Sequence, residues 1–166
     1  MKKIISLVLA LIVLSRAWSQ TDSVQAPYLK NPIFPPVKLL MCDSVSYFVK
    51  DSLPKKKAVM LMLFNPECSH CRHETEELIQ NIDKFKDIEI VMATMMPFEQ
   101  MKAFRDEYKL TNYKNIVVGR DEQYFLFTFY TLRNLPYLAF YNAKKDLISV
   151  HEGSMPIEEV LKELKK

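Results

Sequence analysis

Glycine is almost absent from this chain of 166 residues, which contains only Gly119 and Gly153. Loops that bind nucleotide phosphates need several glycines at fixed spacing, because only glycine lets the backbone approach a phosphate closely. No such loop is present, which argues against nucleotide-dependent catalysis. Cysteine is also scarce, with three residues. The protein therefore cannot be a scaffold held together by several disulfides.

Long apolar runs are lacking too, and so is an excess of positive charge once the first residues are set aside. Residues 1–19 begin with Lys2 and Lys3, continue as an apolar run over 4–14 and end in small residues. The run is too short to span a bilayer, so the pattern predicts a secretory signal peptide over 1–19. The alternatives are an uncleaved amphipathic anchor and a buried first helix.

Removal of this segment leaves a chain of balanced charge. The segment holds three of the 23 basic residues and none of the 20 acidic ones, so residues 20–166 carry 20 of each sign. We therefore expect neither nucleic acid nor an anionic membrane surface as a partner. We also expect no stable membrane insertion after the signal is cleaved.

The rest of the chain alternates between segments typical of strands and of helices. Residues 20–36 are rich in proline and predict an extended leader. Apolar runs predict strands, whereas apolar residues at helical spacing predict helices. The expected strands cover 37–49 (as a hairpin), 58–64, 88–95, 116–118, 137–141 and 147–151. The expected helices begin after Cys68, Pro97 and Pro156, and a further one covers 122–132. Residues 37–166 should form one α/β domain with a mixed central sheet flanked by helices and an N-terminal hairpin extension.

Two cysteines stand three positions apart in the stretch FNPECSHCRHETEEL, where the strand 58–64 gives way to a helix. Cys68 falls at the helix N-terminus, whose free N–H groups and dipole stabilise a thiolate, and Cys71 lies one turn inside. A disulfide between them would close too small a loop to stabilise the fold much. Haem attachment needs a histidine directly after Cys71, and that residue is Arg72. The pair therefore indicates redox chemistry, with metal binding or a structural disulfide as alternatives.

The chain resembles the thioredoxin superfamily at two places, and most closely its exported TlpA-like branch. The first is Cys68-Ser69-His70-Cys71 after its strand, and the second is the segment 130–138 (YTLRNLPYL), which is similar to the thioredoxin stretch that passes through a cis-proline into a strand. The resemblance covers residues 37–166 and implies a thioredoxin-like fold. It also implies that the Leu135–Pro136 bond is cis and faces the disulfide, where the backbone would bind a substrate.

Three residues depart from the thioredoxin pattern. Glu67 replaces the aromatic residue usual before the first cysteine, and its charge would disfavour a thiolate. Met62 replaces the buried acid usual in the preceding strand. His70 resembles the histidine of oxidising and isomerising members, where a positive charge stabilises the reduced form. We expect Glu67 and His70 to tune the redox potential in opposite directions, unless His70 is simply an exposed helix residue.

These observations lead to the hypothesis of an exported thiol:disulfide oxidoreductase in the periplasm of a Gram-negative bacterium. Cys68 and Cys71 are the expected catalytic residues, and Leu135 and Pro136 are expected to bind the substrate. No organic cofactor and no metal are required. The expected partners are protein thiols or disulfides and a membrane or soluble redox partner.

The alternative hypothesis is a periplasmic copper or zinc chaperone that uses the same two cysteines. Soft thiolates suit both metals, although no second C-x-x-C motif completes a four-ligand site. The third cysteine, Cys42, is expected to be a small buried residue of the first strand. The alternative is a thiol that resolves a mixed disulfide or pairs between chains.

Overall fold

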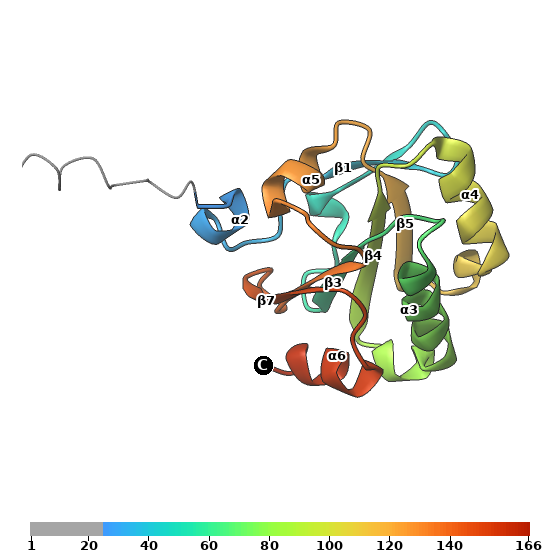
Figure 1. The fold of residues 1–166 in the computed structure, drawn as a ribbon. Coiled ribbons are helices and arrows are strands. Elements are labelled where there is room, and N and C mark those ends of the chain that lie inside the picture. The colour runs from blue at the N-terminus through green and yellow to red at the C-terminus, as the bar shows by residue number, and fades with distance from the viewer. Residues whose placement is uncertain (1–24) are drawn as a thin grey trace, which may run out of the picture.

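A computed structural model describes residues 25–166. The predicted signal peptide over 1–19 lies outside the described residues. Seven strands form one mixed sheet in the order β2-β1-β5-β4-β3-β6-β7 (Figure 1). These strands are β1 (Lys38–Met41), β2 (Tyr47–Val49), β3 (Ala58–Leu63), β4 (Ile88–Thr94), β5 (Ile116–Arg120), β6 (Tyr137–Tyr141) and β7 (Leu147–Glu152).

Strand direction changes across the sheet. The central strands β3, β4 and β5 are parallel, whereas β6 and β7 are antiparallel on one side. The hairpin β1-β2 pairs antiparallel with β5 on the other side. The predicted mixed sheet with an N-terminal hairpin is therefore confirmed.

Helices cover both faces of the sheet (Figure 1). One face carries α3 (Ser69–Gln80), α4 (Phe98–Glu107) and α6 (Ile157–Glu163), and the other carries α5 (Phe125–Tyr130). Short 3-10 turns lie at Lys50–Ser52, Ile82–Phe85 and Leu110–Asn112. In the part of the chain that the structure describes, no helix is long and apolar enough to cross a membrane.

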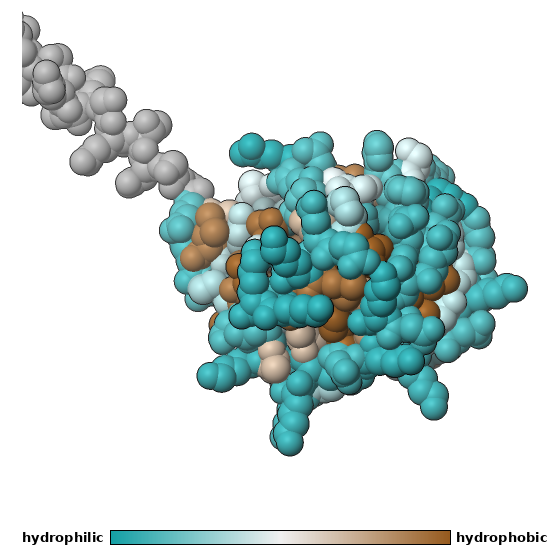
Figure 2. Space-filling view, turned by 90° about the horizontal axis from the view of Figure 1, so that it is seen from below, coloured by the Kyte–Doolittle hydropathy of each residue, from teal (hydrophilic) through white to brown (hydrophobic). Residues whose placement is uncertain are grey.

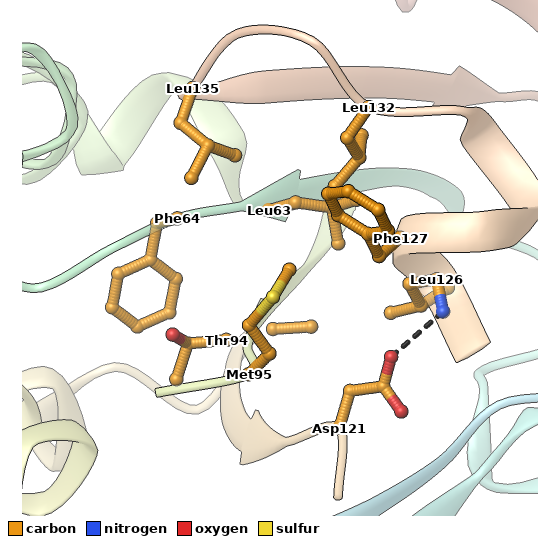
Figure 3. Close-up of a pocket in the computed structure, with 10 residues that line it drawn as sticks. Leu63, Phe64, Thr94, Met95, Asp121, Leu126, Phe127, Leu132 and Leu135 are labelled. Carbon is orange, nitrogen blue, oxygen red and sulfur yellow. Dashed lines mark hydrogen bonds between the residues drawn. The ribbon is translucent and has the colours of Figure 1, made fainter. Parts of the chain in front are cut away.

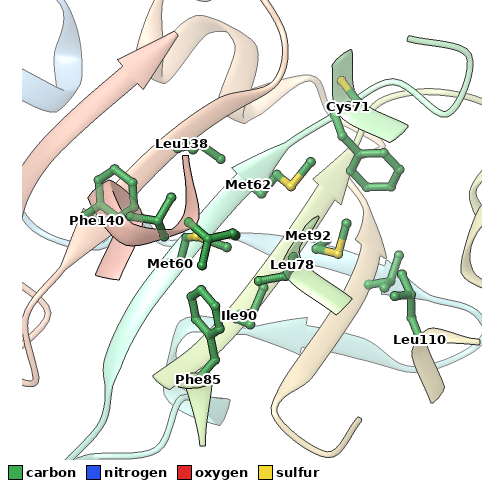
Figure 4. Close-up of a cluster of buried hydrophobic side chains, with 14 of the residues drawn as sticks. Met60, Met62, Cys71, Leu78, Phe85, Ile90, Met92, Leu110, Leu138 and Phe140 are labelled. Atoms are coloured by element: carbon green, nitrogen blue, oxygen red, sulfur yellow. The ribbon is translucent and has the colours of Figure 1, made fainter. Parts of the chain in front are cut away.

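The apolar run that predicts β3 is buried on both faces because successive side chains of a strand point to opposite sides. Met60 and Met62 face α3 and α6, and they pack with Phe140 from β6 in the core shown in Figure 4. Val59 and Leu61 contribute to the second core under α5. Each of these residues is at most 1% exposed.

The proline-rich sequence predicts an extended leader over 20–36. Its described part, 25–36, is not extended throughout. Its residues Pro27–Lys30 form one turn of helix, α2, since Pro27 suits the first position of a helix. Phe34 is fully buried against Tyr141, with ring centroids 5.1 Å apart. The segment therefore packs on the domain. Seen from below, the surface is mostly hydrophilic, and hydrophobic residues show between the hydrophilic ones (Figure 2).

Gly119 in β5 marks a close approach between strands. A Cβ atom at this position would lie 2.7 Å from the Cβ atom of Leu39 in β1. We predict that Gly119→Ala lowers the free energy of unfolding by about 1–3 kcal/mol, because this contact forces β1 and β5 apart. Urea denaturation measures the change as a lower midpoint with the same slope. An unchanged or higher midpoint would show that β1 shifts at no cost.

Candidate active site

Cys68 occupies the N-cap position of α3, immediately after the loop that leaves β3. Its backbone is extended (φ −75°, ψ 119°), and its Sγ atom accepts a hydrogen bond from the Cys71 N–H group at 3.4 Å. Both cysteines are thiols in this structure. The sulfur of Cys68 is thus held against the free N–H groups of the helix, which is the placement that stabilises a thiolate.

Cys71 is in a different environment from Cys68. Cys68 is partly exposed, whereas Cys71 is fully buried and belongs to the core beneath α3 (Figure 4). Burial raises the pKa of the Cys71 thiol well above its usual value, and a hydrogen bond from the Asn65 backbone opposes this shift. The two sulfurs are therefore unequal, with one accessible from solvent and the other protected behind it.

The proline segment predicted to face the cysteines lies beside Cys68. The Leu135–Pro136 peptide bond is cis, as the resemblance implies. The Leu135 carbonyl oxygen lies 3.8 Å from Cys68 Sγ. Gly153 donates its N–H to the Pro136 carbonyl at 2.8 Å, which ties this loop to the end of β7.

Glu67 and His70 are both exposed at this end of the molecule. The Glu67 carboxylate accepts a hydrogen bond from Gln100 Nε2 at 3.4 Å, so it is tied to α4. The backbone carbonyl of His70 accepts a hydrogen bond from Ser154 Oγ at 3.3 Å. No hydrogen bond joins either side chain to a cysteine sulfur among the described residues, and their tuning role stays a prediction.

Glu74 is a residue of this site that the sequence reasoning missed. No motif in the sequence singles out Glu74, yet its side chain is only 3% exposed. Burial raises the pKa of its carboxyl, and its Oε2 atom accepts the Met155 N–H at 2.9 Å. The burial of Glu74 could have been predicted from helical spacing, because Glu74 falls on the same helix face as Cys71 and Leu78. Its charge also raises the pKa of Cys71 further.

An apolar pocket of about 190 Å³ opens beside Leu135. Its lining continues into a deeper hollow under α5 (Figure 3), and the two share Phe64, Met95, Phe127, Leu132 and Leu135. At the foot of the hollow, the Asp121 carboxylate accepts the Leu126 N–H at 2.8 Å and fixes the start of α5. Phe127 is 46% exposed at the rim. The surface next to Cys68 is therefore apolar on this side.

Cys42 lies outside the candidate active site formed around Cys68 and Cys71. It follows β1 and is half-buried, whereas we expected a buried residue within the first strand. This partial burial raises the pKa of its thiol. Within residues 25–166, no group of three or more His, Cys, Asp or Glu side chains is arranged to hold a metal ion.

The fold and the paired cysteines agree with the comparison with known families. The thioredoxin-like domain family matches residues 49–166, and the chain belongs to that family. No curated protein sequence matches it significantly.

Several solved structures share the fold. A secreted Mycobacterium tuberculosis disulfide oxidoreductase, described as homologous to E. coli DsbE, has a TM-score of 0.65 at 19% identity and covers 78% of this chain and 95% of its own. The pneumococcal exposed lipoprotein thioredoxin from Streptococcus pneumoniae has a TM-score of 0.56 at 27% identity, with 77% and 98% covered. A reduced Plasmodium vivax 2-Cys peroxiredoxin reaches 0.65 at 14% identity, with 80% and 92% covered. Since the fold hosts these different proteins, the reaction must be argued from the site.

The buried carboxyl of Glu74 predicts a specific pH dependence of stability. The pKa of Glu74 is higher in the folded protein than in the unfolded chain. Stability is therefore lost as the pH rises from the pKa of the unfolded chain through that of the folded protein, because the buried carboxyl must then ionise. The variant Glu74→Gln keeps an acceptor for the Met155 N–H but cannot ionise. We predict that the stability gained by Glu74→Gln over the wild type is larger at pH 7 than at pH 4, where both side chains are mostly neutral.

Urea denaturation of the two proteins at pH 4 and pH 7 measures this difference. Glu99→Gln, at an exposed position of α4, is the control and should show little dependence on pH. An equal difference at both pH values would mean that Glu74 ionises as freely in the folded protein as in the unfolded chain.

Proposed function

We propose that the protein is an exported thiol:disulfide oxidoreductase that acts on protein cysteines through the Cys68–Cys71 couple. The observation that carries the proposal is the inequality of the two sulfurs, with Cys68 partly exposed at a helix N-terminus and Cys71 buried one turn behind it. The predicted signal peptide over 1–19 supports export. Two relatives of the same fold are described as secreted or exposed. We propose residues 37–166 as the catalytic domain, preceded by the leader 20–36.

The proposed reaction exchanges one disulfide for another. The Cys68 thiolate attacks one sulfur of a substrate disulfide, forms a mixed disulfide and releases the second substrate sulfur as a thiolate. Cys71 then loses its proton and attacks Cys68 Sγ. The Cys68–Cys71 disulfide forms and the first substrate sulfur leaves as a thiolate. Two electrons pass from the protein to the substrate, and the reverse sequence oxidises a substrate dithiol.

The resolving step requires a proton acceptor for Cys71. Its burial disfavours the thiolate, and Met62 stands where the family usually has a buried acid. Glu74 supplies a carboxylate one helical turn away, on the same buried face. We propose Glu74 as the group that takes the Cys71 proton. Its raised pKa brings its proton affinity closer to that of a thiol than an exposed glutamate would have.

Substrate binding is proposed to involve Leu135 and Pro136. The Leu135 carbonyl lies beside Cys68 Sγ, where the backbone of a bound polypeptide would pass. The neighbouring pocket with Phe127 at its rim would accept an apolar side chain of that polypeptide. These steps need no organic cofactor. A second dithiol protein, in the membrane or in solution, would return the couple to its starting state.

Replacement of the resolving cysteine tests the mechanism. With Cys71→Ser, the first attack still occurs but the mixed disulfide cannot be resolved, so we predict that the variant accumulates protein partners bound through Cys68. Non-reducing gels of cell-envelope extracts, followed by release with dithiothreitol, detect these adducts. Cys68→Ser/Cys71→Ser is the matched control and should trap none. Equal trapping by both variants would assign the adducts to Cys42.

The two charged neighbours of the cysteines predict opposite shifts in reduction potential. His70→Ala removes an imidazole whose protonated form stabilises the thiolate, so the couple should become more reducing. Glu67→Gln removes a charge that repels the thiolate, so the couple should become more oxidising. Each shift should be on the order of 10 to 30 mV and should shrink as salt screens the charges. Equilibration with glutathione buffers measures both, and no shift in either variant would exclude the proposed tuning.

A further inference from the structure

Asn65, in the loop between β3 and Cys68, contacts the backbone that leads to the first cysteine. The Asn65 carbonyl accepts the Cys68 N–H at 3.0 Å, and the Asn65 side chain accepts the Glu67 N–H at 2.9 Å. The Asn65 backbone also lowers the pKa of the Cys71 thiol, which opposes the effect of burial. A shift of segment 64–66 would therefore change the position of Cys68 relative to Cys71.

This segment is held by a closed ring of contacts through α4. Phe64 packs on Phe104 with ring centroids 4.6 Å apart, and Phe104 packs on Tyr108 at 4.7 Å. The Arg72 guanidinium lies over the Tyr108 ring, 5.3 Å from its centroid. Arg72 Nη1 then donates to the Pro66 carbonyl at 3.3 Å. Pro66 is two residues after Phe64, so the contacts return to the segment from which they start.

Arg72 also connects α3 to α4 by a charged contact. Its Nη2 atom forms an ion pair with Glu107 on α4, next to Tyr108. The hydroxyl of Tyr108 donates to Glu76 Oε1 at 3.1 Å, which returns the contact to α3. The side chain of Arg72 is 36% exposed, so the ion pair alone contributes little to stability. Its geometry is the distinctive feature, because one planar group meets a carbonyl, a carboxylate and an aromatic face at once.

We propose that Arg72, held by Tyr108, is a positioning residue that fixes the loop before Cys68 so that Cys71 can attack its sulfur. The proposal rests on the proposed function, since it concerns the resolving step of that reaction. Lysine cannot replace arginine here, because a single ammonium group lacks the planar fork that reaches Pro66 and Glu107 and stacks on Tyr108. Misplacement by a fraction of an ångström slows an intramolecular attack more than it slows the attack of Cys68 on an external disulfide.

The experiment separates these two attacks with 5,5′-dithiobis(2-nitrobenzoate) as substrate and all variants in a Cys42→Ser background. The reduced protein releases one thionitrobenzoate when Cys68 attacks the reagent. It releases a second when Cys71 displaces the group bound to Cys68. The first phase depends on reagent concentration and reports the reactivity of Cys68. The second is unimolecular and reports the geometry of the pair.

We expect Arg72→Met and Arg72→Lys each to slow the second phase about tenfold, with a smaller effect on the first. Tyr108→Leu should slow it similarly, and Arg72→Met/Tyr108→Leu should be no slower than the single variants, because both changes open the same ring. Tyr108→Phe keeps the aromatic face and should behave like the wild type. Lys84→Met is the control. It breaks the ion pair of Lys84 with Glu158, and Lys84 lies in the turn after the C-terminal end of α3, whereas the loop before Cys68 precedes the N-terminal end of this helix.

A second phase of wild-type rate in Arg72→Lys would overturn the proposal, because a positive charge alone would then suffice. Equal slowing in Lys84→Met would overturn it as well, since the effect would then be general loosening of the fold. If the wild type itself released only one equivalent, the proposed dithiol mechanism would fail together with the positioning role. If the wild type released two and the Arg72 variants matched its rate, the positioning role alone would fail.

Discussion

The pairing of β3 with β6 is the constraint on which the candidate site depends. β3 lies between β4 and β6, and its register places Leu63 opposite Tyr137. Because the two strands are antiparallel, the end of β3 that leads to Cys68 meets the beginning of β6, which directly follows Pro136. Residues 67 positions apart in the chain are thereby brought to within 3.8 Å. Burial on both faces of β3 fixes this register, since a slip by one residue would exchange the side chains of the two cores.

The burial of α3 then determines which sulfur is exposed. The buried face of the helix carries Cys71, Glu74, Thr75 and Leu78, at the spacing of one helical stripe. Cys68 precedes the first turn and lies outside this stripe, so it meets both solvent and the free N–H groups of the helix. The same packing that stabilises the helix therefore creates one accessible thiol and one protected thiol. The stripe also contains the carboxyl of Glu74, whose pKa is raised by burial, so its ionisation opposes folding.

Much of the fold could be predicted from the sequence because apolar runs and helical stripes are local. The run 58–64 predicts β3, which ends one residue earlier, at Leu63, and the change from strand to helix correctly puts Cys68 at the start of α3. The predicted helix near 122–132 was too long, because Tyr124 and Thr131 adopt left-handed backbone conformations at the two ends of α5. The helical turn α2 was missed although Pro27 suits its first position, because the turn is stabilised by packing against α5, which the sequence pattern does not show. The ring through Arg72 and Tyr108 could not be predicted, because it joins residues that only the tertiary fold brings together.

The central claim is that Cys68 and Cys71 form a reversible two-electron couple. The most direct test is to equilibrate the full chain with dithiothreitol and glutathione buffers of defined potential, quench with acid, alkylate and assign each cysteine by mass spectrometry. The account predicts one reversible transition in which Cys68 and Cys71 are lost as thiols together and joined in a disulfide, while Cys42 stays a thiol. Oxidation in which Cys68 pairs with Cys42 or with a second chain, and Cys71 remains a thiol throughout, would contradict it.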